Sequence, residues 1–441
     1  MGTLIKLAWP PGVSSGLPRG ARRGCDYEAY LPDCLAGQRI SLSGEVAADV
    51  ADAEGAVARL SREAGALADS EAVARLLLRA EAVASSRIEG LEVGGRRLLK
   101  AQLAVDLGQE PSDVTATEVL NNIEAMRWAV ESLSTARPIA VEDLLAIHER
   151  LLTGTSLGRY AGKVREQQNW IGGSSYNPCS AAFVPPPCEH VWELLEDLCR
   201  FCNEDSAPAV VQAALAHAQF ETIHPFIDGN GRTGRALIHV ILRRRGLAPV
   251  VLPPVSLVLA SWSQHYVDGL TATRCNSEPT SREAVEGLDA WIGLFAAATE
   301  RAVTDAEAYE QRVAAVQQAW RRRLGRVRAN SAVDWLIDAL PGAPIVTVQS
   351  AAALIGRSEQ AVNEAIARLQ RTDVLKQTSV GRRNRAFEAT DLLDAFTDLE
   401  RRLASPDGDT RHSAPQRRVP HRPGDARAQF PRRHAIQAPS S

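Results

Sequence analysis

The chain has 441 residues, a formal net charge of −3 and 45% hydrophobic residues. This length predicts about three domains at ~150 residues each, and the ordinary composition predicts that most of the chain is globular. No apolar run approaches the ~20 residues of a membrane-spanning helix, so we expect no membrane partner. Residues 1–13 lack the apolar segment of a secretory signal. Seven cysteines without a dense framework favour a reduced, cytoplasmic compartment.

The net charge is distributed unevenly along the chain. Residues 321–441 carry 21 Lys and Arg against 13 Asp and Glu, whereas residues 1–320 carry 29 against 40. The near-neutral average therefore covers an acidic body and a basic C-terminal part. Such a split is typical of a nucleic-acid partner or of a solvated tail, and both interpretations stay open.

Taken in chain order, the sequence predicts a mainly α protein. Residues 1–35 are rich in Gly, Pro and Arg, which indicates an irregular arm. From Val46 onward apolar residues recur at helical spacing, which predicts an N-terminal helical region over residues 36–112. A core over residues 113–320 follows. Its predicted helices cover residues 116–133, 141–152, 188–203, 208–223, 230–246 and 284–324.

Two parts of the chain depart from this helical pattern. Residues 169–187 contain paired glycines, paired serines and three consecutive prolines, with Ile171 and Val184 as strand-like anchors. This composition predicts a hairpin-like loop inside the helical core. Residues 321–404 begin with a basic run and predict a separate small domain, and residues 405–441 predict a disordered basic tail.

The densest chemistry lies in residues 224–235, which read His-Pro-Phe-Ile-Asp-Gly-Asn-Gly-Arg-Thr-Gly-Arg. We expect a loop that joins two helices. Gly229 and Gly231 leave backbone N–H groups accessible at the start of the second helix, which favours an anion such as phosphate. Arg232 and Arg235 lie three residues apart on one helix face, so both can contact one polyphosphate.

Two further side chains of this loop supply chemistry. Asp228 offers a hard oxygen to Mg²⁺, which usually needs only one or two carboxylates plus phosphates. His224 is the only group of the loop that exchanges a proton near neutral pH. Each feature alone is typical of an ordinary turn or a structural histidine, and the P-loop pattern is absent. Their coincidence in one short segment favours a catalytic phosphate site.

The segment resembles the motif H-x-F-x-D-G-N-G-R-x-x-R of the Fic family and matches it at every fixed position. Fic proteins transfer AMP from ATP to a hydroxyl side chain of a target protein. The resemblance implies that His224 is the general base and that Asp228 holds Mg²⁺. It also implies a set of nucleotide-binding residues, with the last of them nearest the γ-phosphate: Gly229, Asn230, Gly231, Arg232, Gly234 and Arg235.

Residues 81–90 predict the end of an amphipathic helix, in which Ser85 and Glu89 form an ordinary i,i+4 polar pair. The segment also resembles the inhibitory motif [ST]-x-x-x-E-[GN] that accompanies many Fic domains. This resemblance implies that Glu89 pairs with Arg235, occupies the γ-phosphate position and keeps activity low. It implies that Glu89→Gly releases the activity.

The loop at 169–187 resembles the flap of the same family, an extended edge that holds a target segment by main-chain pairing. The resemblance implies that Ile171, Gly172 and Val184 contact the target. The alternative is a surface hairpin that binds no partner.

Residues 331–404 resemble the winged helix-turn-helix modules that often follow Fic cores. Ser358 is a candidate N-cap for a helix at 359–370, and residues 378–387 resemble a two-stranded wing with a basic tip. The resemblance implies DNA contact through the wing and through polar residues of that helix, which are Asn363, Arg368 and Gln370. Two glutamates on the same helix favour a protein-interaction or dimerisation module instead.

These patterns together predict a Fic-type helical core with a β-hairpin flap, followed by a small winged-helix domain of α+β type. The predicted function is a protein adenylyltransferase that uses ATP and Mg²⁺, modifies a hydroxyl of a target protein, and is autoinhibited by Glu89. Self-modification and a homodimer are further expectations. One alternative is a DNA-binding regulator with a nucleotide-sensing Fic core, and another is a Fic enzyme that removes AMP or uses another nucleotide.

Overall fold

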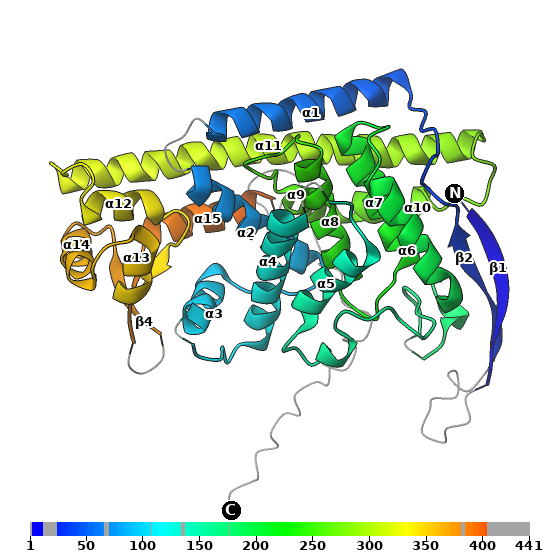
Figure 1. Cartoon of the computed structure of the whole chain (residues 1–441), viewed down its shortest axis with the longest axis horizontal. Helices are drawn as coiled ribbons and strands as arrows, with labels where there is room; N and C mark the ends of the chain where they lie inside the picture. Colours follow the sequence, from blue (N-terminus) through cyan, green and yellow to red (C-terminus); the bar gives the residue numbers. More distant parts are fainter. Residues whose placement is uncertain are drawn as a thin grey trace, which may run out of the picture.

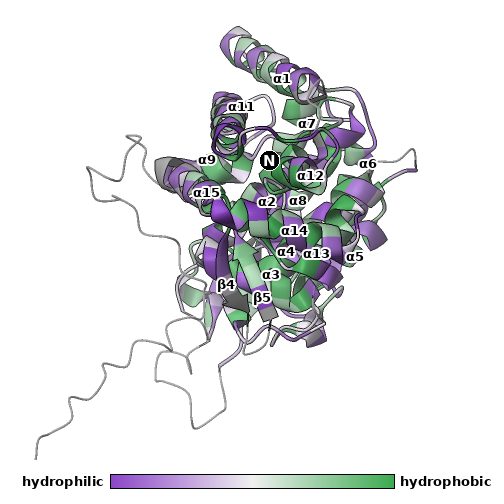
Figure 2. Ribbon diagram, turned by 90° about the vertical axis from the view of Figure 1, so that its left-hand side faces the viewer, coloured by the Kyte–Doolittle hydropathy of each residue, from purple (hydrophilic) through white to green (hydrophobic). Residues whose placement is uncertain are grey.

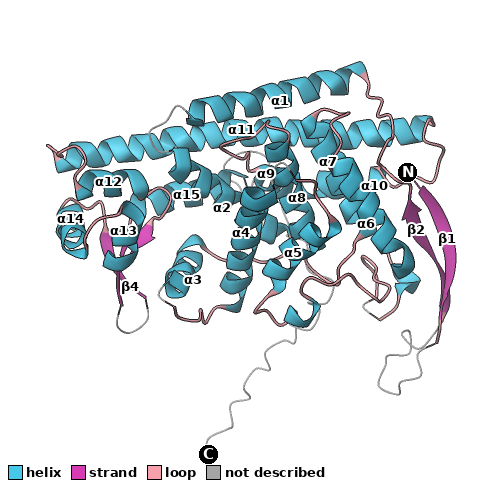
Figure 3. Cartoon of the chain, in the orientation of Figure 1, coloured by secondary structure: helices cyan, strands magenta, loops and turns pink. Residues whose placement is uncertain are grey.

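The computed structural model of the chain describes residues 2–11, 24–65, 70–106, 108–133, 137–174, 176–380 and 384–403. Within these ranges the protein is mainly helical, as predicted, and its strands lie at the two ends of the elongated molecule (Figure 1, Figure 3). The predicted tail at 405–441 and the predicted wing tip at 381–383 lie outside the described residues.

The helices before the C-terminal part are α1 (Gly44–Gly65), α2 (Ser70–Ile88), α3 (Gly95–Asp106), α4 (Val114–Leu133), α5 (Val141–Leu152), α6 (Cys188–Cys202), α7 (Ala209–Ile223), α8 (Asn230–Arg244), α9 (Val255–Ser261), α10 (Ser263–Ala272) and α11 (Arg282–Leu324). Those expected from helical spacing are present, with ends within about two residues. The short helices α3, α9 and α10 were not predicted. No helix among the described residues is both long enough and apolar enough to cross a bilayer.

The 43-residue helix α11 runs along the length of the molecule and organises it (Figure 1). Helix α1 lies along one side of α11, and α7, α9 and α10 pack against it elsewhere. The buried residues of α1 alternate at steps of four and three: Val46, Val50, Ala53, Val57 and Leu60. Figure 2 shows the result as mixed purple and green turns on α1 and α11. One apolar stripe per helix is thus enough to hold the pair together.

Helix α7 lies at the centre of the fold, and every one of its residues is buried. It packs against α6, α8 and α11, while α2, α4 and α5 cover the remaining faces of α8. The loop between α7 and α8 therefore begins and ends in the best-packed part of the molecule. A close-packed surround of this kind restricts the loop to one conformation.

The N-terminal arm is a β-hairpin, which corrects the irregular structure predicted for residues 1–35. Strand β1 (Gly2–Trp9) pairs antiparallel with β2 (Cys25–Pro32), with Gly2 opposite Pro32. Along β1 from Lys6 to Trp9, exposed and half-buried residues alternate, which is the period-two pattern of a strand. The glycines, prolines and arginines that suggested an irregular arm are concentrated at 12–23, outside the described residues.

A disulfide joins Cys25 of β2 to Cys179 in the loop at 169–187. The sequence favoured a reduced compartment because the cysteines form no dense framework. Disulfides persist in oxidising environments, so this bridge argues against that expectation. The bridge ties the hairpin covalently to the loop, which Tyr30 also contacts through its N–H and the Val184 carbonyl, 2.9 Å apart.

The C-terminal part combines short helices with a small sheet. Its elements are α12 (Ala332–Ala339), β3 (Ile345–Val346), α13 (Val348–Ile355), α14 (Glu359–Arg371), β4 (Lys376–Val380), β5 (Asn384–Glu388) and α15 (Thr390–Leu403). The sheet is antiparallel in the order β3-β5-β4. Helix α11 crosses the boundary predicted at residue 320 and contacts α12 and α15 on the far side.

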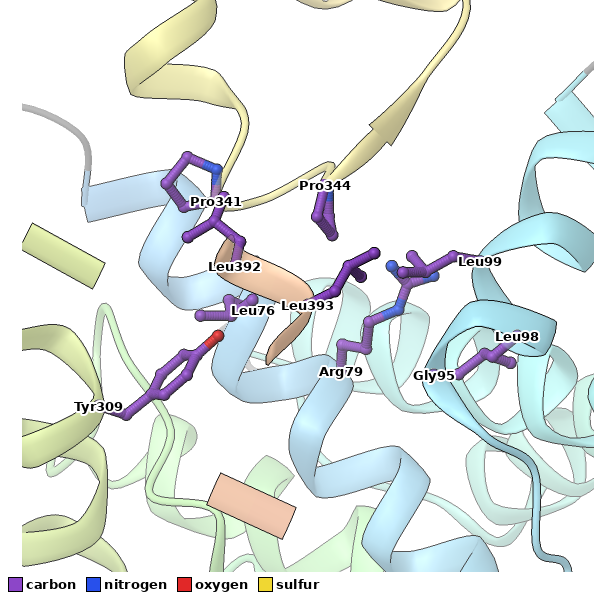
Figure 4. Close-up of a pocket in the computed structure, with 10 residues that line it drawn as sticks. All are labelled: Leu76, Arg79, Gly95, Leu98, Leu99, Tyr309, Pro341, Pro344, Leu392 and Leu393. Carbon is purple, nitrogen blue, oxygen red and sulfur yellow. The ribbon is translucent and has the colours of Figure 1, made fainter. Parts of the chain in front are cut away.

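A mostly apolar cavity lies where α2, α3 and the C-terminal part meet (Figure 4). Leu76 and Arg79 of α2 line it together with Leu98 and Leu99 of α3 and Leu393 of α15. The N-terminal half of α2 therefore borders incompletely filled space. Other contacts must fix the position of α2 along its axis.

Candidate active site

The segment 224–235 forms a tight loop between α7 and α8. His224 ends α7 in the left-handed region with φ 48°, and Gly229 precedes α8 with φ 83°. The first N–H groups of a helix have no acceptor within it, so those at the start of α8 are available to an anion. The backbone therefore has the geometry of a phosphate-binding helix N-terminus.

His148 of α5 supports this loop from below. Its ring stacks on Phe226 with centroids 3.7 Å apart and an interplanar angle of 4°. Its Nδ1 accepts the Gly162 N–H at 3.2 Å, so Nε2 carries the proton and donates to the Asp228 carbonyl at 2.9 Å. Burial lowers the pKa of His148 to about 4, which keeps it neutral in this role.

Arg165 and Asn169 hold the loop from its other side. The buried Arg165 guanidinium donates to the carbonyls of His224, at 2.9 Å, and Pro186, at 2.6 Å. The Asn169 amide donates to the carbonyls of His224, at 3.2 Å, and Phe226, at 3.1 Å. Sequence reasoning missed these two residues and His148, because side chains that bind backbone carbonyls leave no motif.

His224 is placed to act as a base. Burial lowers the pKa of its imidazole to about 4, and the charges of Arg165 and Arg274 add to this effect. The ring is therefore neutral at pH 7 and has a lone pair that can accept a proton. Its Nδ1 lies 4.0 Å from Glu221 Oε2, and the side chain is 20% exposed.

Asp228 and Arg232 form an i,i+4 pair across the start of α8, with Arg232 Nη2 3.3 Å from Asp228 Oδ2. The Arg232 side chain is fully buried, and Glu118 of α4 lies 3.8 Å from its Nη1. The Asp228 side chain is 21% exposed. A partly exposed carboxylate beside a phosphate-binding helix end fits Mg²⁺, which takes its remaining ligands from phosphates and water. Among the described residues, no group of three or more His, Cys, Asp or Glu offers an all-protein metal site.

Two of the predicted nucleotide-binding residues have other contacts. The buried Asn230 side chain accepts the Phe226 N–H at 2.8 Å and donates to the Phe226 carbonyl at 2.9 Å, which leaves only its backbone for a phosphate. At Gly234 an added Cβ would lie about 3.0 Å from His217 and Phe220 of α7. Gly234 therefore allows α8 to approach α7, which corrects its expected place among the nucleotide contacts.

Glu89 lies directly against Arg235. Arg235 Nη2 donates to Glu89 Oε1 at 2.7 Å and to the Ser85 carbonyl at 2.8 Å, while Nε donates to Ser85 Oγ at 2.9 Å. A Cβ at Gly231 would lie 2.0 Å from Glu89 Oε1. The carboxylate thus covers the first turn of α8, where only glycine leaves room for it.

The predicted β-hairpin flap is not formed as two strands. Residues 169–187 contain one isolated bridge, between Ile171 and Phe183, and a short 3-10 helix (Pro178–Ser180). Gly172 has φ 76° and begins the turn. Val184 is buried and its carbonyl is used by Tyr30, so Phe183 takes the pairing position expected of Val184. The prolines that follow restrict further pairing because they lack an N–H.

Glu221 is a buried carboxyl beside this site. Burial raises its pKa to about 7 from an ordinary value of 4.5, against the opposing charges of Arg235 and Arg274. The folded state therefore retains a proton that the unfolded chain releases, and the free energy of unfolding falls as pH rises from about 4.5 to 7. We expect Glu221→Gln to remove a fall of up to about 3 kcal/mol, measured by urea denaturation at pH 5 and pH 8. The exposed residue Glu92 gives the control, and an equal fall in Glu221→Gln and Glu92→Gln would contradict this prediction.

Comparisons with known proteins agree with this geometry. Residues 138–242 match the model of the Fic/DOC family, and residues 47–131 match that of the Fic/DOC family N-terminal region. Protein adenylyltransferase fic-1 of Caenorhabditis briggsae is 36% identical over 141 residues, which is 31% of this chain and 26% of that protein. Protein adenylyltransferase Fic of Drosophila ananassae is 34% identical over 161 residues, which is 36% of this chain and 30% of that protein. The matches thus span less than a third of these curated relatives.

Solved structures include a Fic family protein from Desulfovibrio desulfuricans G20, with a TM-score of 0.49 and 20% identity over 79% of this chain and 97% of that one. Fic-1 from C. elegans has a TM-score of 0.45 and 25% identity over 60% of this chain and 74% of that one. The family matches, which cover α1–α8 and the loop at 224–235 almost entirely, confirm the resemblance stated above. The chain therefore carries a Fic domain of the Fic/DOC family, preceded by that family's N-terminal region.

Proposed function

We propose that the chain is a protein adenylyltransferase, which transfers AMP from ATP to a Ser, Thr or Tyr hydroxyl of a protein target. The observation that carries this proposal is the neutral imidazole of His224 in the loop that leads to the N-terminus of α8. Asp228, Arg232 and Arg235 lie on the same loop and first turns. The identity with protein adenylyltransferases of C. briggsae and D. ananassae supports the same activity.

In the proposed reaction the target hydroxyl gives its proton to His224 Nε2, since Nδ1 is directed to Glu221. The hydroxyl oxygen bonds to the α-phosphorus of ATP, the bond from that phosphorus to the bridging oxygen breaks, and pyrophosphate leaves. The N–H groups at the start of α8 and the guanidinium of Arg232 stabilise the charge of the transferring group. Asp228 would hold Mg²⁺, whose charge would offset that of the phosphates.

The contact between Glu89 and Arg235 supports autoinhibition as part of this proposal. A carboxylate that occupies the arginine and stands over Gly231 repels the γ-phosphate from its place. ATP then binds without the alignment that in-line attack on the α-phosphorus needs. The proposed ground state of the chain is therefore nearly inactive.

The test compares ATP labelled at the α-phosphate with ATP labelled at the γ-phosphate, using the Glu89→Gly protein with Mg²⁺ and a cell lysate. We expect only the α-label to enter protein and mass spectrometry to find an adduct of one AMP. The same reaction without lysate tests self-modification. Parallel reactions with GTP, CTP and UTP, and with a modified target, test the alternatives of another nucleotide and of AMP removal. Transfer of the γ-label, or no label from any nucleotide, would contradict the proposal.

The C-terminal part is proposed to be a winged helix, on the order α12-β3-α13-α14-β4-β5 and its three-stranded sheet. Arg368, which the sequence offered to DNA, instead donates to the carbonyls of Leu324, at 3.1 Å, and Arg326, at 2.8 Å. This contact fastens α14 to the end of α11. DNA contact through Asn363 and the wing, a homodimer and a cytoplasmic location stay predictions.

A further inference from the structure

Helices α2 and α8 meet along a regular series of contacts between residues four apart. Glu81 of α2 contacts His239 of α8, Ser85 contacts Arg235, and Glu89 lies over Gly231. Residue numbers rise along α2 as they fall along α8, so the helices are antiparallel. Each step of four residues is about 6 Å. The first contact of the series therefore lies roughly 12 Å along α2 from the inhibitory glutamate.

The contact at Glu81 is completely buried. Glu81 Oε1 lies 2.7 Å from His239 Nε2, and both side chains are 0% exposed. Glu81 Oε2 accepts the Ser256 N–H of α9 at 2.7 Å, and Oε1 accepts the Ser256 hydroxyl. One carboxylate thus joins α2 to α8 and α9 at once. The proposed chemistry uses none of these three residues.

The rest of α2 does little to fix its position along its axis. The residues around Glu81 are small, with Ala80, Ala82 and Ala84 all buried, and small side chains interdigitate weakly with a neighbouring helix. The N-terminal half of the helix borders the cavity of Figure 4. A buried polar group is the best-attested means of fixing the register of packed helices, because every other register leaves it without partners.

The end of α2 carries this register to Glu89. Gly90 adopts φ 78°, the Gly90 N–H donates to the Arg87 carbonyl at 2.9 Å, and the Leu91 N–H donates to the Ser86 carbonyl at 3.0 Å. This pair of bonds is the Schellman motif, which fixes the backbone at a helix C-terminus. Glu89 is therefore rigidly connected to α2. A slip of one turn, about 5.4 Å, would remove its carboxylate from Arg235.

We propose that Glu81 and His239 are positioning residues that set the register of α2 on α8 and thereby hold Glu89 against Arg235. This inference rests on the proposed function, since it concerns the inhibition of that activity. It assigns a part of the inhibition to a cluster that touches neither nucleotide nor target. Loss of the cluster frees the inhibitory helix while leaving the catalytic loop intact.

The test measures AMP transfer from α-labelled ATP by the full chain and its variants. We expect Glu81→Ala to raise the rate roughly tenfold, within the range typical of coupling between sites. Glu81→Gln keeps an acceptor for the Ser256 N–H, so its rate rises less. In the Glu89→Gly background, Glu81→Ala changes the rate less than about twofold, because contacts that act through one element are not additive.

Leu198→Ala on α6 is the matched control, because Leu198 is equally buried and α6 makes no extensive contact with α2. It lowers the melting temperature without raising the rate, which separates release from mere destabilisation. If Glu81→Ala does not fold, Glu81→Gln and His239→Gln carry the test, with hydrogen exchange of the amides at 82–90 as a second readout. Faster exchange together with a higher rate supports the proposal.

Folded Glu81 and His239 variants that label and exchange as the wild type does, while Glu89→Gly is released, would overturn the positioning role alone. A Glu89→Gly protein that labels no better than the wild type would instead contradict the proposed inhibition. In that case hydrogen exchange still reports whether Glu81 fixes α2. The two proposals therefore fail by different outcomes.

Discussion

Replacement of Glu89 by glycine is expected to raise AMP transfer by one to two orders of magnitude, the scale of a coupling free energy of about 1–3 kcal/mol. The carboxylate accepts a bond from Arg235 Nη2 at 2.7 Å and stands over Gly231. Its removal frees a fully buried guanidinium for the γ-phosphate and opens the first turn of α8. The rate is measured with α-labelled ATP at saturating Mg²⁺.

Two variants show which property of Glu89 matters. Glu89→Gln keeps the size of the side chain and removes its charge, so we expect an intermediate rate. Glu92→Gly introduces the same backbone freedom three residues later, at an exposed position, and should leave the rate unchanged. An equal rise in Glu92→Gly and Glu89→Gly would show that chain flexibility, rather than the carboxylate, limits the wild-type protein.

Replacement of His224 by alanine is expected to lower AMP transfer of the Glu89→Gly protein by a factor of about 10²–10⁴, the usual contribution of a general base. The pKa of His224 is lowered to about 4, so the base form is present throughout the neutral range. The rate of the His224 protein should therefore be level down to about pH 5 and fall as pH approaches 4. A rate–pH profile at constant ionic strength measures this limb.

The control for His224 must respect its backbone. His224 has φ 48°, and alanine at a left-handed position costs about 1–2 kcal/mol. Asn tolerates that conformation, so His224→Asn should fold as the wild type does and still be inactive. Substantial AMP transfer by His224→Asn would assign the base to another group.

Much of the central fold was predictable because its helices have strong periodicity. The prediction for α5 matches its observed ends, and α8 begins where the glycines of the motif end. Helix α3 follows a glycine pair, has low mean hydropathy and buries its apolar residues under the C-terminal part, so its sequence resembles a loop. The strand β2 was missed because half of its pattern depends on pairing with β1, which is remote information for a local reading.

The candidate site divides along the same line. The residues of segment 224–235 stand in one motif, so their proximity follows from the chain itself. His148 and Arg165 reach that segment from α5 and from the loop after it, and they bind backbone carbonyls. Every residue offers such a carbonyl, so nothing in the sequence marks the ones that are used.

The disulfide between Cys25 and Cys179 gives the chain a covalent topology with a practical meaning. The two cysteines are 154 residues apart, and the closed ring that they form contains α1–α5, including the segment with Glu89. A protease that cuts anywhere within this ring produces a nicked molecule, not two fragments. The inhibitory segment therefore stays attached to the catalytic domain after cleavage, and its physical separation requires both a cut and a reductant.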